Sequence, residues 1–216
     1  MSMIILIGGE KGGTGKSCIA QNISVALQEL YKDLIIVDCD PQKTTSDWVH
    51  ERGKFNKTVE QIQCIQLYGN ILPQLEKLQK KFQVVVIDCG GQDTKALRSS
   101  LVCCTHALFP IRPKRRDLRT LSHLDELLQV SRINNPNMKY SVVINQAPSL
   151  PSQNKRITDA IEICKDWNIP CLNTILFHRN IYDDSEESGL SVMESDSDSK
   201  ASGEIRSLVL EFFNKK

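Results

Sequence analysis

Several features that define whole classes of protein are missing from this sequence. None of its apolar runs approaches the length needed to cross a lipid bilayer. The formal net charge is only +1, so any binding to nucleic acid has to come from a local patch rather than from overall charge. The N-terminus lacks the basic segment and small-residue cleavage site of a secretory signal, which predicts a cytoplasmic protein.

Cysteine is present, but not in the spacings that hold metals. The eight cysteines are scattered along the chain, no C-x-x-C pair occurs, and several lie within apolar runs. This pattern predicts buried free thiols rather than a disulfide framework or a zinc site.

A glycine-rich stretch near the start is the most informative part of the sequence. A strand-length apolar run, Met3 to Ile7, leads into it, and a helix-like segment, Cys18 to Leu30, follows it. Its sequence is close to the phosphate-binding pattern G-x-x-x-x-G-K-[ST], although strict spacing places Glu10 where the first glycine belongs. The stretch reads Lys11-Gly12-Gly13-Thr14-Gly15-Lys16-Ser17.

The residue types in this stretch fit a nucleoside triphosphate. Glycines let the backbone turn tightly and bring its N–H groups against phosphate oxygens, and the following helix adds its positive N-terminal end. Lys16 can reach the β- and γ-phosphates, and the Ser17 hydroxyl can coordinate Mg²⁺. The order of strand, loop and helix therefore predicts a P-loop.

Strand-like and helix-like segments alternate along the rest of the chain. The continuous apolar runs at 34–38 and 84–88 are typical of strands covered on both faces. This alternation predicts one P-loop NTPase domain over residues 1–216, an α/β fold with a doubly wound, mostly parallel sheet flanked by helices. Further strands are expected at 62–67, 107–111, 140–145 and 171–176, helices at 71–80, 118–130, 156–167 and 202–213, and a solvated acidic loop at 183–199.

Carboxylates follow two of the predicted buried strands. Asp38 and Asp40 belong to the segment Asp38-Cys39-Asp40-Pro41-Gln42, and Asp88 ends the run at 84–88. Ligands in doubly wound sheets bind beyond the carboxyl ends of the strands, so Asp88 is predicted to hold Mg²⁺ directly or through water. Asp40 is predicted to reach the Mg²⁺ shell or to orient the attacking water. Capping or turn formation is the alternative for all three carboxylates.

A dense basic stretch follows the predicted strand at 107–111. It could hold DNA phosphates without reading sequence, and a dimer would present it twice. A solvated charged surface is the alternative interpretation. The candidate DNA contacts are Arg112, Lys114, Arg115, Arg116 and Arg119.

Two of these motifs together resemble one family. The stretch at 11–17 resembles the deviant Walker A motif of the ParA/MinD family of dimeric ATPases, and the segment at 38–42 is similar to its D-x-D-P-Q segment. The resemblance continues through 84–88, 109–113, 117–118 and 142–146. In the tail, 189–192 and 200–201 look like the small, ParF-like partition ATPases.

The resemblance implies a role for individual residues. Lys11 would be the signature lysine that reaches across a face-to-face dimer to the partner's phosphates, acting in catalysis with Lys16 and Asp40. Asn145 would lie against adenine. ATP is preferred over GTP on this likeness, and no N-K-x-D guanine motif is present. The implied nucleotide contacts are Gly12, Gly13, Thr14, Gly15, Lys16, Ser17, Cys18 and Asn145, with Ser17 and Asp88 at the magnesium ion.

The function implied is an ATP-dependent switch. ATP and Mg²⁺ would drive formation of a homodimer that binds nucleoid DNA non-specifically, and a centromere-binding adaptor would stimulate its slow hydrolysis of ATP. Such a protein would partition a plasmid or a chromosome. Two alternatives remain open: a positioning ATPase for protein cargo, and a MinD-like regulator that cycles on a membrane. The second would need a basic amphipathic C-terminal helix, whereas Ile205 to Phe213 is expected to pack on the sheet without stable membrane association.

Overall fold

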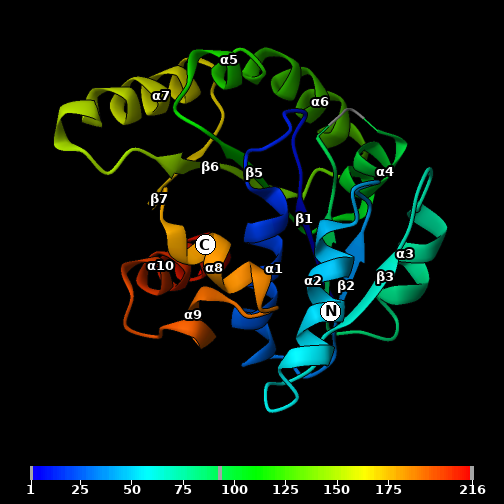
Figure 1. Ribbon diagram of the computed structural model, residues 1–216. Helices are drawn as coiled ribbons and strands as arrows, with labels where there is room; N and C mark the ends of the chain where they lie inside the picture. The colour runs from blue at the N-terminus through cyan, green and yellow to red at the C-terminus, as the bar shows by residue number, and fades with distance from the viewer. Residues whose placement is uncertain (1, 92–93, 215–216) are drawn as a thin grey trace.

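One parallel sheet forms the centre of the molecule. The computed structural model describes residues 2–91 and 94–214. Within these residues seven strands pair in the order β3-β2-β4-β1-β5-β6-β7, and every pairing is parallel (Figure 1). The strands are β1 (Met3–Ile7), β2 (Leu34–Asp38), β3 (Gln63–Gln66), β4 (Val84–Asp88), β5 (His106–Ile111), β6 (Lys139–Ala147) and β7 (Cys171–Phe177).

The strand register places the carboxyl ends of β1, β2 and β4 side by side. Ile7 at the end of β1 lies opposite Asp88 at the end of β4, and Asp88 lies opposite Asp38 at the end of β2. The glycine-rich loop that leaves β1 therefore begins beside both carboxylates. This arrangement follows from continuous apolar runs that bury β1, β2 and β4 on both faces of the sheet.

Helices cover both faces, as predicted for a doubly wound sheet. Each face has its own hydrophobic core, so the sheet separates two layers of helices (Figure 1). One layer contains α1 (Lys16–Gln28), α2 (Thr44–Phe55), α8 (Asn180–Glu187), α9 (Val192–Ser195) and α10 (Lys200–Asn214). The other contains α3 (Leu72–Leu78), α4 (Lys95–Cys103), α5 (Arg115–Leu118), α6 (Leu121–Asn134) and α7 (Asn154–Asp166), with a 3₁₀ turn η1 (Pro151–Gln153) before α7.

Helix α2 was not anticipated from the sequence. Its buried residues are Thr45, Trp48 and Arg52, which have helical spacing but include a cation. Arg52 is completely buried, donates to the backbone oxygens of Glu60 and Gly189, and forms a bidentate ion pair with Glu194. A search for apolar periodicity misses such a helix because its inward face contains charge.

The expectation of a solvated loop at 183–199 was wrong. Most of this stretch is folded, as part of α8 and as α9, and Val192 and Met193 are buried. Ser191 caps α9 in a reciprocal capping box with Glu194, whose carboxylate also pairs with Arg52. One acidic residue of this stretch, Glu194, therefore neutralises the buried cation Arg52.

The C-terminal helix packs as expected. The apolar face of α10, with Ala201, Ile205, Leu208 and Phe212, is buried in the same core as α1. Across the described residues, no helix has both the length and the apolar character needed to span a membrane. The eight cysteines form no disulfide among the described residues. Four are buried (Cys39, Cys89, Cys104 and Cys164), whereas the other four are half-buried, so the expectation of buried thiols holds for half of them.

The ion pair between α2 and α9 gives a test of this packing. Replacing Glu194 with alanine leaves the charge of Arg52 buried without its partner, so we expect a loss of about 3 kcal/mol in unfolding free energy. Denaturant unfolding measures it. The matched control is Glu60→Ala, which removes the exposed ion pair with Lys32 and should cost about 0–1 kcal/mol. Equal losses in both variants would contradict the stabilising role given to Glu194.

Candidate functional site

The glycine-rich loop connects β1 to α1 at the carboxyl edge of the sheet. Gly13 and Gly15 have φ angles of 72° and 82°, a left-handed conformation that favours glycine at both positions. Gly15 is also the N-cap of α1, so the loop ends at the positive end of a helix of 13 residues. This is the backbone arrangement that binds phosphate in P-loop proteins.

The two lysines of the loop lie in different environments. Lys16 is 6% exposed, and its Nζ donates to the backbone oxygen of Lys11 over 2.9 Å. Burial lowers the pKa of Lys16, while the charges of Asp88 and Asp40 act in the opposite direction. The side chain of Lys11 is exposed. One lysine therefore faces the inside of the loop, and the other is accessible from outside.

Glu10, the residue in place of the first motif glycine, contacts a different element. Its carboxylate lies against the imidazole of His123 on α6 and forms an ion pair when that ring is protonated. The start of the loop is thereby joined to the helix layer beneath it.

Asp88 is a buried carboxylate with one free oxygen. Its Oδ2 accepts a hydrogen bond of 2.7 Å from Thr45 Oγ1, whereas its Oδ1 has no partner among the residues that the structure describes. Burial raises the pKa of Asp88 to about 6, and the nearby hydroxyls of Thr45 and Ser17 act against this rise. An unpaired buried oxygen beside a serine hydroxyl is a donor set that suits Mg²⁺.

The fit to magnesium does not need a cage of protein ligands. No cluster of three or more His, Cys, Asp or Glu side chains suited to a metal is found in the described part of the chain. Mg²⁺ in nucleotide sites commonly takes one or two protein oxygens, with phosphates and waters completing its shell. Ser17 and Asp88, the two residues named from sequence, are those that would hold it here.

Asp38 and Asp40 have different surroundings. Asp38 is fully buried, and its carboxylate accepts hydrogen bonds from the backbone of Asp40 and from both the backbone and hydroxyl of Ser46. It therefore shapes the turn into α2, which is the alternative raised for this residue. Asp40 is half-buried and accepts from the Gln42 backbone, but it also lines the cavity beside the loop.

The glycine pair after β4 lies directly against the first loop. A Cβ on Gly91 would lie only 2.6 Å from the backbone nitrogen of Gly12, and one on Gly90 would lie 3.1 Å from Oδ2 of Asp40. Only a residue without a side chain allows the two backbones to approach so closely. The loop after Asp88 is thus in direct contact with the phosphate-binding loop.

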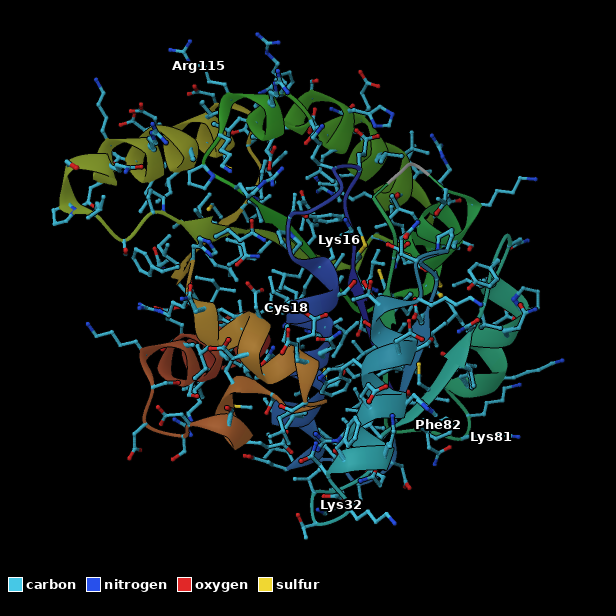
Figure 2. All side chains as sticks on the ribbon, in the orientation of Figure 1. Lys16, Cys18, Lys32, Lys81, Phe82 and Arg115 are labelled. Carbon is cyan, nitrogen blue, oxygen red and sulfur yellow. The ribbon has the colours of Figure 1, made fainter. Side chains whose placement is uncertain are left out.

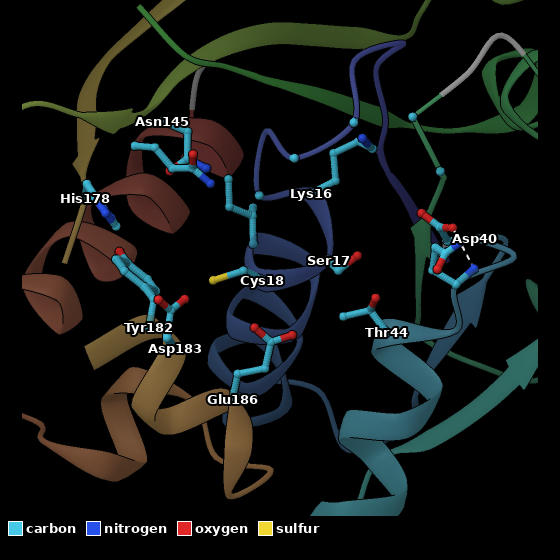
Figure 3. A pocket seen from close by; sticks show the side chains of 18 of the residues that line it. Lys16, Ser17, Cys18, Asp40, Thr44, Asn145, His178, Tyr182, Asp183 and Glu186 are labelled. Atoms are coloured by element: carbon cyan, nitrogen blue, oxygen red, sulfur yellow. Dashed lines mark hydrogen bonds between the residues drawn. The ribbon is translucent and has the colours of Figure 1, made fainter. Parts of the chain in front are cut away.

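A cavity of about 840 Å³ extends from these loops toward β7 and α8. Figure 3 shows Lys16, Ser17 and Asp40 at one side of it, and Asn145, His178 and Tyr182 at the other. Its volume falls within the usual range for small-molecule sites. The sequence analysis missed the wall formed by His178, Tyr182, Asp183 and Glu186. Asp183 and Glu186 belong to the stretch at 183–199 that was expected to be solvated.

Three of the predicted nucleotide contacts are placed around the loop. Asn145 donates a hydrogen bond of 2.7 Å from Nδ2 to the backbone oxygen of Thr14, which ties the end of β6 to the loop. Thr14 itself is buried, and its hydroxyl lies 3.4 Å from the Lys11 oxygen. Burial raises the pKa of the Cys18 thiol, which therefore lines the cavity as a neutral group.

The basic stretch divides into two parts. Lys114, Arg115, Arg116 and Arg119 are exposed around α5, and Figure 2 shows Arg115 on the outside of the molecule. Arg112 is instead paired with the buried carboxylate of Asp117 through two hydrogen bonds. The structure thus separates Arg112 from the other four candidate DNA contacts.

This arrangement of loop, lysines and carboxylates can be compared with known proteins. Residues 5–192 match the model of the CobQ/CobB/MinD/ParA nucleotide binding domain. The chain belongs to this family. The family match agrees with the resemblance found in the motifs at 11–17 and 38–42, and it covers every strand from the middle of β1 to the end of β7.

Individual members of the family are similar over almost the whole chain. Maintenance of carboxysome distribution protein A of Halothiobacillus neapolitanus is 27% identical over 194 residues, covering 88% of this chain and 86% of that protein. The structure of apo McdA from Cyanothece superposes with a TM-score of 0.80 at 14% identity, covering 99% of this chain and 100% of that one. MinD from Pyrococcus horikoshii, solved with Mg-ADP, gives a TM-score of 0.74 at 17% identity, covering 100% and 97%. These structures confirm the α/β P-loop NTPase fold.

The contact between Gly91 and Gly12 gives a test of the site. Gly91→Ala places a methyl group against the loop backbone, so we expect nucleotide affinity to fall about tenfold because the phosphate-binding loop is displaced. Titration with a fluorescent ATP analogue measures it. Gly203→Ala is the matched control, since a Cβ there meets nothing within 4 Å. Unchanged affinity in Gly91→Ala would show that the contact does not matter for binding.

Proposed function

We propose that this chain is an ATPase whose ATP-bound form is a homodimer and acts as a switch. Membership of the nucleotide-binding family supports binding of ATP with Mg²⁺, and the loop, Ser17 and Asp88 supply the groups that such binding needs. The observation that carries the proposal is the division between the two loop lysines. Lys16 serves its own subunit, and the exposed Lys11 is free to reach the phosphates of a partner subunit.

The proposed chemistry follows from these positions. Lys16 neutralises the terminal phosphates, Ser17 and Asp88 hold the metal, and Asp40 orients the attacking water. Lys11 of the opposing subunit adds positive charge where negative charge develops during transfer. Because that charge comes from a partner, ATP binding favours formation of the dimer. Hydrolysis of ATP then allows the dimer to dissociate. We expect slow hydrolysis that an adaptor protein accelerates.

The dimer is proposed to bind nucleoid DNA through the four exposed basic residues around α5. Lys114, Arg115, Arg116 and Arg119 offer exposed positive charge that can hold backbone phosphates, and phosphate contacts carry no sequence information, so the binding is proposed to be non-specific. Dimerisation would present two such patches and raise the effective affinity.

Two kinds of cargo fit this switch. Partition of a plasmid or chromosome, through a centromere-binding adaptor, follows from the likeness to partition ATPases. Positioning of a protein assembly is favoured by the similarity to a carboxysome distribution protein over 88% of this chain. A neighbouring reading frame for a DNA-binding adaptor would support partition, and one for a compartment-bound adaptor would support protein cargo.

A membrane-cycling role has less support. The apolar face of α10 is buried against the sheet and α1, so it does not present the free amphipathic surface that such a role needs.

Lys11→Ala tests the switch. We expect the variant to bind nucleotide while losing ATP-dependent dimerisation, because its exposed side chain contributes to the partner's site rather than its own. Analytical ultracentrifugation with a non-hydrolysable ATP analogue measures assembly, with the exposed Lys81→Ala as the control. Normal dimers in Lys11→Ala would refute the role of this lysine in trans.

Charge reversal tests DNA binding. Changing Lys114, Arg115 and Arg116 to glutamate should weaken retention on DNA and reduce the log–log salt slope by about 3 per subunit, since each phosphate contact contributes roughly 0.9. Basal ATP hydrolysis should persist, because these exposed side chains do not line the cavity. Lys77, Lys80 and Lys81, which are also exposed, changed together to glutamate serve as the control with the same change in net charge. An unaltered salt slope would show that the basic residues around α5 do not contact DNA.

A further inference from the structure

Arg112 differs from its basic neighbours in where its charge lies. Its side chain is 20% exposed, whereas Lys114, Arg115 and Arg116 are exposed. It directly follows β5, the strand that pairs with β1. Arg112 therefore leaves the sheet at the same edge, and beside the same strand, as the phosphate-binding loop.

The guanidinium of Arg112 is held in a fixed orientation. Its Nε donates to Oδ2 of Asp117 over 2.6 Å, and its Nη2 donates to Oδ1 over 3.1 Å. Asp117 is 1% exposed, so this fork is anchored on a buried carboxylate. This bidentate ion pair uses two of the three guanidinium nitrogens and leaves Nη1 for another partner.

The remaining nitrogen faces the loop. Nη1 lies 3.6 Å from the point where a Cβ on Gly13 would be, and Gly13 has the left-handed φ angle of 72°. With no side chain at that position, nothing on Gly13 separates Arg112 from the loop backbone. A positive terminal nitrogen thus lies next to the loop that receives the phosphates.

Arg112 and Lys16 border the same loop. Lys16 is the last lysine of the loop, and Nη1 of Arg112 lies against Gly13, three residues before it. Two cations at one loop are favourable where an anion lies with them. Lys16 in such a loop reaches the β- and γ-phosphates, so the charge of Arg112 acts at the same end of the nucleotide.

We propose that Arg112, held by Asp117, is a second cation supplied by the same subunit to the triphosphate, and that it favours ATP over ADP. The inference rests on the proposed function, in which this loop binds ATP. It gives Arg112 a part in distinguishing the two nucleotide states of the switch, in place of the DNA contact considered from sequence.

Nucleotide titration tests the proposal. Because Arg112→Met alone would leave the carboxylate of Asp117 buried without its partner, the pair is replaced together, as Arg112→Met with Asp117→Asn. Binding of fluorescent ATPγS and ADP, each with Mg²⁺, is measured for this variant and the wild type. We expect affinity for ATPγS to fall about tenfold or more and affinity for ADP to change much less, since a charge-assisted hydrogen bond is lost.

A second variant and a control keep the test independent of folding. Arg112→Lys retains the ion pair with Asp117 but lacks the fork, so we expect only partial preference for ATPγS. Arg116→Met removes an exposed charge from the same segment and should leave the preference unchanged. Circular dichroism confirms that each variant is folded.

The outcomes separate the two proposals. An unchanged ATPγS-to-ADP affinity ratio in Arg112→Lys and in the double variant, with normal binding by the wild type, overturns the role of Arg112 alone. Failure of the wild type to bind either nucleotide overturns the proposed ATP site, and the role of Arg112 with it.

Discussion

The buried carboxylate of Asp88 is the constraint around which the site is arranged. It lies at the end of a fully buried strand, between β1 and β2, with one oxygen bound to Thr45 and the other without a partner in the described chain. A charge placed there needs positive partners, and Lys16 supplies one within the same loop. The unpaired oxygen of Asp88 is therefore the atom that would accept a metal ion in the site we propose.

Helix α2 and the residues that hold it position the two carboxylates. Thr45 and Ser46 belong to α2 and contact Asp88 and Asp38, so the position of α2 sets both carboxylates. Helix α2 is in turn fixed by Arg52, whose buried charge is balanced by Glu194 near the end of the chain. Residues more than a hundred positions apart thus support one another, and the acidic tail segment contributes to the geometry of the nucleotide site.

Most of the fold could be predicted from the sequence because the strands and several of the helices follow local residue patterns. The strand-like segments expected from sequence match all seven strands of the described chain, although 62–67 is an alternating pattern rather than an apolar run, and the loop at 11–17 predicts a phosphate site. Helix α4, which buries Ala96, Leu97 and Leu101, was not predicted. Two further errors arose where burial is polar. Helix α2 faces the core with Thr45 and Arg52, and α9 is held by a capping box, neither of which gives an apolar period. The position of Arg112 depends on Asp117 and Gly13 in space, and a run of basic letters cannot distinguish a paired arginine from exposed ones.

The contact between Gly91 and Gly12 couples two segments without any side chain between them. A side chain can change rotamer and absorb a displacement, but two touching backbones transmit it. The segment leaving β4 and the loop leaving β1 therefore cannot move independently where Gly91 and Gly12 meet. A displacement of the loop at Gly12 acts on the backbone of Gly91, three residues after Asp88 at the carboxyl end of β4.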